Sequence, residues 1–81
     1  MSKSTRRKNI SGRRIAEARS HARPPITQEE LSGKLALLGV QLDRAAIAKI
    51  ESDRRRVLDF ELKTIAQALE VPVEWLLGGS H

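Results

Sequence analysis

The chain has 81 residues, a length that predicts one small domain without a separate effector-binding domain. It contains no cysteine, which excludes disulfides, thiolate metal sites and cysteine nucleophiles. The formal net charge is +5 and is unevenly distributed, because residues 1–23 carry eight basic residues against one acidic residue, whereas residues 24–81 carry seven against nine. This asymmetry favours a polyanionic partner for the first quarter of the chain, although a solvated basic tail is the simpler alternative.

The sequence predicts neither a membrane span nor a signal peptide. No apolar run approaches the roughly 18 residues that a membrane span needs. The basic N-terminus also lacks the apolar segment of a signal peptide. We therefore expect a soluble, cytoplasmic protein with no membrane partner.

The chain begins with a polar and basic stretch at residues 1–9, which predicts a flexible arm in front of a domain at 10–79. A first helix is expected from about Ser11 to Arg23, because Ile15, Ala18 and Ala22 recur at helical spacing. The two prolines at 24 and 25 end it, since proline lacks the N–H that a helix interior uses. The basic residues of the arm are Lys3, Arg6, Arg7 and Lys8.

A second helix is expected to open at Thr27, which forms a capping box with Glu30. Leu31, Leu35 and Leu38 follow on one face, and Gly39 is a plausible C-terminal stop. A short connection leads to a third helix at about 43–52. Asp43 serves as its N-cap, and Ile47 and Ile50 face inward.

Residues 54–57 form a basic loop before a fourth helix, for which Asp59 is the expected N-cap. The inward face of that helix contains Leu62, Ile65, Ala66 and Leu69. A short fifth helix opens at Val71-Pro72, with proline at its preferred first position, and ends at Gly78-Gly79. The only aromatic residues, Phe60 and Trp75, fall at core-like or terminal positions. Five short helices without strand-like alternation predict an all-α bundle.

Three segments, ITQEELSGKL, AIAKIESDRR and FELKTIAQALEVPVEWLL, resemble the Cro/C1-type (XRE-like) helix-turn-helix family. The resemblance covers roughly residues 10–77 and includes Arg19, Thr27-Gln28, Gly39-Val40 and Ile47 through Glu51. It implies the lambda-repressor-like five-helix domain, here with an extended helix-turn-helix. It also implies a sequence-specific regulator, a repressor, that binds double-stranded DNA at a palindromic operator.

The resemblance assigns roles to two groups of residues. Arg44, Ala45, Ala48 and Lys49 would contact base edges in the major groove; the alternative is that the two basic side chains are ordinary solvated charges. The phosphate-contacting residues would be Gln28, Ser52, Arg54 and Arg56. Arg55 is free to point elsewhere.

The resemblance also implies a structural ion pair between Arg19 and Glu51. Two departures from the family pattern stand out. The segment between the second and third helices is longer, and the spacing of Leu35 and Leu38 predicts an extra helical turn there. The glycine that usually follows the recognition helix is Asp53, and aspartate tolerates positive φ better than most residues.

Family members usually pair to read two half-sites, so we expect a homodimer. The apolar cluster at the C-terminus predicts the interface, formed by Trp75, Leu76 and Leu77. Alternatively, Trp75 folds back and covers the core.

Two other functions remain open: an antitoxin-like protein that binds a small toxin partner and represses its own operon, and a protein-interaction module without DNA binding. An enzyme is not expected, because the sequence has no nucleotide-binding glycine loop, no H-x-x-H pattern and no tyrosine. We expect no cofactor and no metal.

Overall fold

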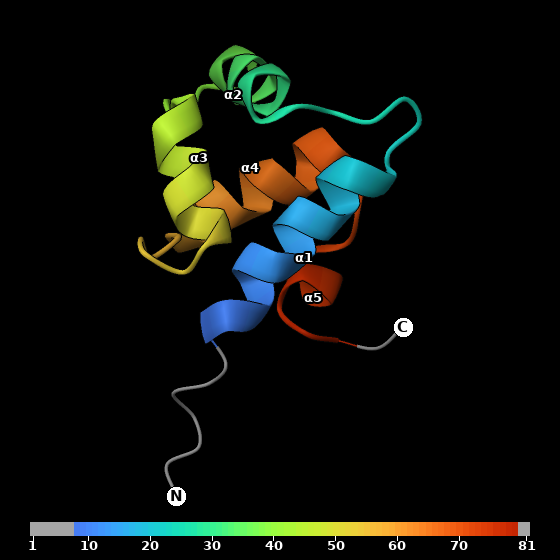
Figure 1. Cartoon of the computed structure of the whole chain (residues 1–81), viewed down its shortest axis with the longest axis vertical. Helices are drawn as coiled ribbons and strands as arrows, with labels where there is room; N and C mark the ends of the chain where they lie inside the picture. Colours follow the sequence, from blue (N-terminus) through green and yellow to red (C-terminus); the bar gives the residue numbers. More distant parts are fainter. Residues whose placement is uncertain (1–7, 80–81) are drawn as a thin grey trace, which may run out of the picture.

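The computed structural model describes residues 8–79, and the side chains from Ile10 onward within that range. All regular secondary structure in the described range is helical, which confirms the prediction of an all-α bundle (Figure 1). The helices are α1 (Lys8–His21), α2 (Gln28–Leu37), α3 (Arg44–Glu51), α4 (Asp59–Leu69) and α5 (Val73–Leu76).

Helix α1 differs from its predicted bounds at both ends. It begins at Lys8 rather than Ser11, so the last two residues of the predicted arm belong to a helix. The Ile10 side chain lies against Gly78, near the C-terminal end of the described chain. This contact packs the first turn of α1 against the rest of the domain. The helix ends at His21 rather than Arg23, and the Ile26 N–H bonds back to the Arg19 carbonyl at 3.0 Å.

Helix α2 begins as predicted, with the Thr27 hydroxyl accepting from the Glu30 N–H and the Glu30 carboxylate accepting from the Thr27 N–H. The predicted extra turn is helical as far as Leu37, and Gly39 then reverses the chain with φ of +91°. The prediction that Leu38 shares one helix face with Leu31 and Leu35 is wrong: those two are buried, whereas Leu38 is 43% exposed because the helix has already ended there.

Of the three remaining helices, only α3 begins with the cap that the sequence predicted. Asp43 caps α3, its carboxylate accepting from the Ala46 N–H at 2.8 Å. Helix α4 is not capped by Asp59, which is already its first helical residue; the capping position is Leu58. Helix α5 begins at Val73. Pro72 was expected to be its first helical residue but occupies the capping position, one residue before the helix.

The core lies where α1 packs against α3, α4 and α5, and where α2 packs against α3 and α4. Phe60, expected at a core-like position, is instead more than half exposed near the start of α4. Among residues 8–79, no helix combines the length and apolar character that a membrane crossing requires. Within the described range, the largest side chains that are almost completely buried are Ile15, Leu31, Leu35, Ile47, Ile65 and Leu76.

Candidate nucleic-acid interface

Helix α3 has two faces of opposite character. Ile47 and Ile50 are buried in the core, as predicted. At about 100° of rotation per residue, the four residues predicted to contact bases fall within about 140° of arc on the opposite side. Of these four, Ala48 is half-buried, and the exposed ones are Arg44, Ala45 and Lys49. The structure therefore brings them together on one outward face.

The end of α3 is held by a carboxylate that contacts two other helices. Arg19 of α1 and Glu51 form the ion pair that the resemblance implies, with Nε–Oε2 and Nη2–Oε1 distances of 2.9 Å. Gln28 of α2 donates its amide to Glu51 Oε1, also at 2.9 Å. Arg19 further donates to the Ile26 carbonyl at 3.1 Å. These hydrogen bonds fix α3 relative to α1 and to the start of α2.

Charge and hydrogen bonding reinforce one another in this pair. The hydrogen bond from Arg19 to the Glu51 carboxylate raises the pKa of the guanidinium, and this outweighs the opposing effect of burial. The predicted phosphate contact of Gln28 stays a prediction. Its observed hydrogen bond to Glu51 places the residue beside the end of α3.

Helices α1 and α3 also approach closely at Gly12. A Cβ atom at this position would collide with the Ile50 carbonyl oxygen and would lie 3.2 Å from that of Glu51. Only a residue without a side chain fits there unless the backbone moves. Sequence reasoning missed this role, although a glycine inside a helical pattern is a signal of close packing.

The segment after α3 turns sharply. Asp53 adopts the left-handed conformation with φ of +65°, as expected where the family has glycine. The Arg54 N–H bonds to the Lys49 carbonyl at 2.7 Å, and the Ser52 hydroxyl donates to the Ala48 carbonyl at 3.0 Å. Ser52 and Arg54 are thereby placed on the surface directly beyond the outward face of α3.

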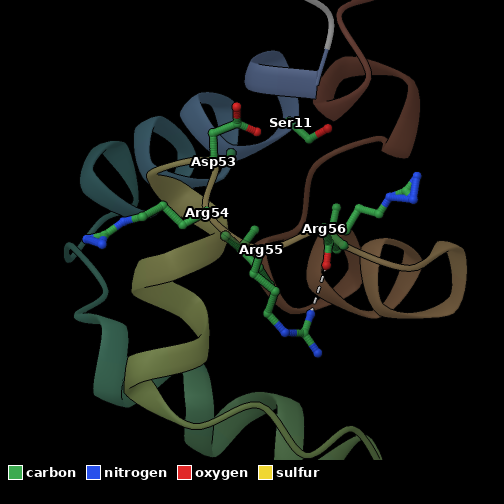
Figure 2. Close-up of a pocket in the computed structure, with 8 residues that line it drawn as sticks. Ser11, Asp53, Arg54, Arg55 and Arg56 are labelled. Carbon is green, nitrogen blue, oxygen red and sulfur yellow. Dashed lines mark hydrogen bonds between the residues drawn. The ribbon is translucent and has the colours of Figure 1, made fainter. Parts of the chain in front are cut away.

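Arg55 differs from the arginines on either side of it. Its guanidinium donates to both oxygens of Glu61, at 3.1 and 3.2 Å, and to the Arg56 carbonyl at 3.0 Å. Arg54 and Arg56 are exposed. In Figure 2 they extend in opposite directions, on either side of Arg55.

Glu61 is 5% exposed and is the one buried charged residue of the described chain. It accepts from the Leu58 N–H at 2.9 Å in addition to Arg55. Burial by itself raises the pKa of this carboxyl, but the hydrogen bonds from Arg55 and Leu58 outweigh it and leave the pKa lowered. The sequence carried a signal for this role, because Glu61 lies three residues after the capping position, where a capping-box glutamate belongs.

Residues of this segment and of α1 line a pocket of about 460 Å³, shown in Figure 2. The lining contains Ser11 and Gly12 of α1 together with Asp53 through Val57. The start of α1 therefore lies beside the arginine loop. Of the arm residues, Lys3, Arg6 and Arg7 lie outside the described part of the chain, and only the backbone of Lys8 is described, in the first turn of α1.

The C-terminal segment does not form the predicted interface as a unit. Leu76 is 0% exposed within a single chain, so it belongs to the core and cannot contact a partner. Trp75 packs against the core, as its alternative role requires, and the Arg14 guanidinium lies 4.6 Å from the centre of its ring. The prediction is wrong for Leu76, because α5 buries one face against α1 and α4. Leu77 is 61% exposed.

Within residues 8–79, no group of acidic or histidine side chains could hold a metal ion. Comparison of the chain with family models, curated proteins and solved structures finds no match.

Proposed function

We propose that this chain is a sequence-specific double-stranded DNA-binding regulator of transcription, a repressor, that reads the major groove with α3. The observation that carries the proposal is the outward face of α3, followed directly by Arg54 and Arg56. An α-helix with its side chains is about 10–12 Å across, comparable to the width of the major groove. The opposite face of α3 is fixed in the core, so the outward face can enter the groove as a rigid unit.

The side chains on this face have the chemistry that base recognition needs. Arg44 and Lys49 can donate to guanine O6 and N7, and the methyl groups of Ala45 and Ala48 can contact a thymine methyl. Phosphate contacts would set the register of the helix. The residues proposed for them are Gln28, Ser52, Arg54 and Arg56. The arm would add further cationic contacts to the backbone.

One such domain covers a single half-site, so the proposal includes a homodimer on a palindromic operator. Leu76 is buried and would not take part in the contact between the two copies. The large apolar residues that are exposed in the described chain are Leu37, Leu38, Leu58, Phe60 and Leu77.

The decisive experiment is a selection of bound sequences from random duplex DNA, followed by competition binding of Arg44→Ala against selected and scrambled duplexes. Arg44→Ala should lose about 1–3 kcal/mol of discrimination while keeping affinity for scrambled DNA. The matched control is Arg23→Ala, which removes an exposed arginine from the α1–α2 connection, across the molecule from α3 in Figure 1. Equal losses on both duplexes would reject base reading by Arg44, and recovery of no sequence preference would reject the proposal.

A further inference from the structure

The loop between α3 and α4 is closed by its own ion pair. Arg55 holds Glu61 with both terminal nitrogens, and one oxygen of Glu61 also accepts from the Leu58 N–H. Arg55 in addition donates to the Arg56 carbonyl. One buried carboxylate therefore fixes the backbone of the loop at two points, directly at Leu58 and through Arg55 at Arg56.

This arrangement engages the Arg55 guanidinium within the chain, while 35% of its side chain stays exposed. Both of its terminal nitrogens are bonded within the chain, and its guanidinium faces Glu61. Three consecutive arginines thus divide into one internal ligand and two exposed cations that extend in opposite directions (Figure 2). Without the internal pair, three like charges on one short loop would repel each other and widen the range of loop conformations.

Loop order matters for binding to phosphate. A mobile loop must lose conformational freedom when its arginines meet a DNA backbone, and that loss weakens binding. A loop that is already fixed avoids this loss, and it places its two exposed arginines at a constant separation. The bidentate contact from Arg55 is suited to this role, because a planar guanidinium fixes orientation as well as distance.

We propose that the Arg55–Glu61 pair is a positioning device for DNA binding, which holds the loop so that Arg54 and Arg56 contact phosphates. This inference rests on the proposed function and deepens it by assigning a role to two residues that touch no DNA. Glu61 is a positioning residue, since it acts through the shape of the loop.

The test is Glu61→Gln, chosen because simple electrostatics and positioning predict opposite signs. The substitution removes a negative charge, which by itself would strengthen binding to DNA. Positioning predicts that affinity for a mixed-sequence duplex falls, by about 5- to 10-fold at low salt. Arg55→Lys should weaken binding similarly, although it leaves the net charge unchanged, because lysine lacks the planar fork.

A double-mutant cycle shows whether the effect passes through the exposed arginines. In a chain that carries Arg54→Ala and Arg56→Ala, the further change Glu61→Gln should leave affinity unchanged within about 2-fold. All variants are compared well below their unfolding temperatures, with helical circular dichroism as the check on folding. If Glu61→Gln proves unstable, Arg55→Lys provides the same comparison with the buried carboxylate retained.

The possible outcomes separate the two proposals. Unchanged or tighter binding by both Glu61→Gln and Arg55→Lys overturns the positioning role alone. A loss that persists in the double-alanine background overturns it too, because Glu61 would then not act through Arg54 and Arg56. Failure of the wild-type chain to bind the duplex at low salt overturns the proposed function, and the positioning role with it.

Discussion

Two regions of the domain are each organised by one carboxylate, and they differ in what that carboxylate connects. Glu51 joins α3 to Arg19 of α1 and Gln28 of α2, which lie 32 and 23 positions away in the chain. Glu61 bonds Arg55 and the Leu58 N–H, only 6 and 3 positions away. The first carboxylate therefore holds helices together, and the second shapes a single loop.

The difference shows that ion-pair geometry alone does not determine an ion pair's role. Both pairs are bidentate arginine–carboxylate contacts with similar distances. The two pairs differ in the number of residues between the partners, and so in the length of the loop that each pair closes. A contact between distant segments is lost only when the tertiary structure opens. Substitutions around Glu51 should thus affect global stability, whereas those around Glu61 should act mainly on the loop.

The largest loss of folding stability is expected for Glu51→Ala. The change leaves the half-buried Arg19 and Gln28 without their shared acceptor, and we expect unfolding to become easier by about 3 kcal/mol, the low end for a broken buried pair. Chemical denaturation of the wild type and the variant measures this difference. Glu17→Ala, which removes an exposed carboxylate from α1, is the control and should stay within about 0.5 kcal/mol of the wild type. A loss at Glu51 as small as the control would remove the distinction between the two regions.

A smaller loss of folding stability is expected for Gly12→Ala, where α1 packs against the end of α3. The added Cβ would meet the backbone of Ile50 and Glu51 in the last turn of α3, and we expect a loss of about 1–3 kcal/mol. Gly33→Ala is the matched control, since Gly33 also lies within a helix but has no atom within 4 Å of the added Cβ. It should gain about 0.5–1 kcal/mol from helix propensity. Equal changes at both glycines would show that close approach at Gly12 contributes nothing.

The smallest effect expected is the loss, on acidification, of the stability that the Glu61 carboxylate contributes to the loop. The lowered pKa of Glu61 means that the unfolded chain binds a proton more readily than the folded one. The stabilisation is therefore present above the ordinary glutamate pKa and is lost as pH falls through the lower pKa of the folded state. The stability gap between the wild type and Glu61→Gln should narrow on acidification below about pH 4.3. Denaturation curves collected across this range test it, and a gap independent of pH would contradict the assignment.

Local sequence signals determined much of the fold. The Thr27–Glu30 capping box, the Asp43 cap and the turn at Gly39 depend on residues within a few positions of one another, and all are present in the structure. The inward positions of Ile47 and Ile50 follow from helical periodicity in the same way. The pair of Arg19 and Glu51 came from the family resemblance instead, because no local pattern connects residues so far apart.

Tertiary structure decided the features that depend on what lies opposite a residue. Leu38, Leu76 and Leu77 are equally apolar, yet Leu76 is buried and the other two are exposed, because burial depends on the helices that pack nearby. The need for glycine at position 12 comes from the backbone of α3, and the division of roles among Arg54, Arg55 and Arg56 comes from Glu61 in α4. Composition and spacing along the chain determined which segments are helical and where positive charge gathers. Only the packing of α1, α3 and α4 determined which of those charges are bonded within the chain and which remain exposed.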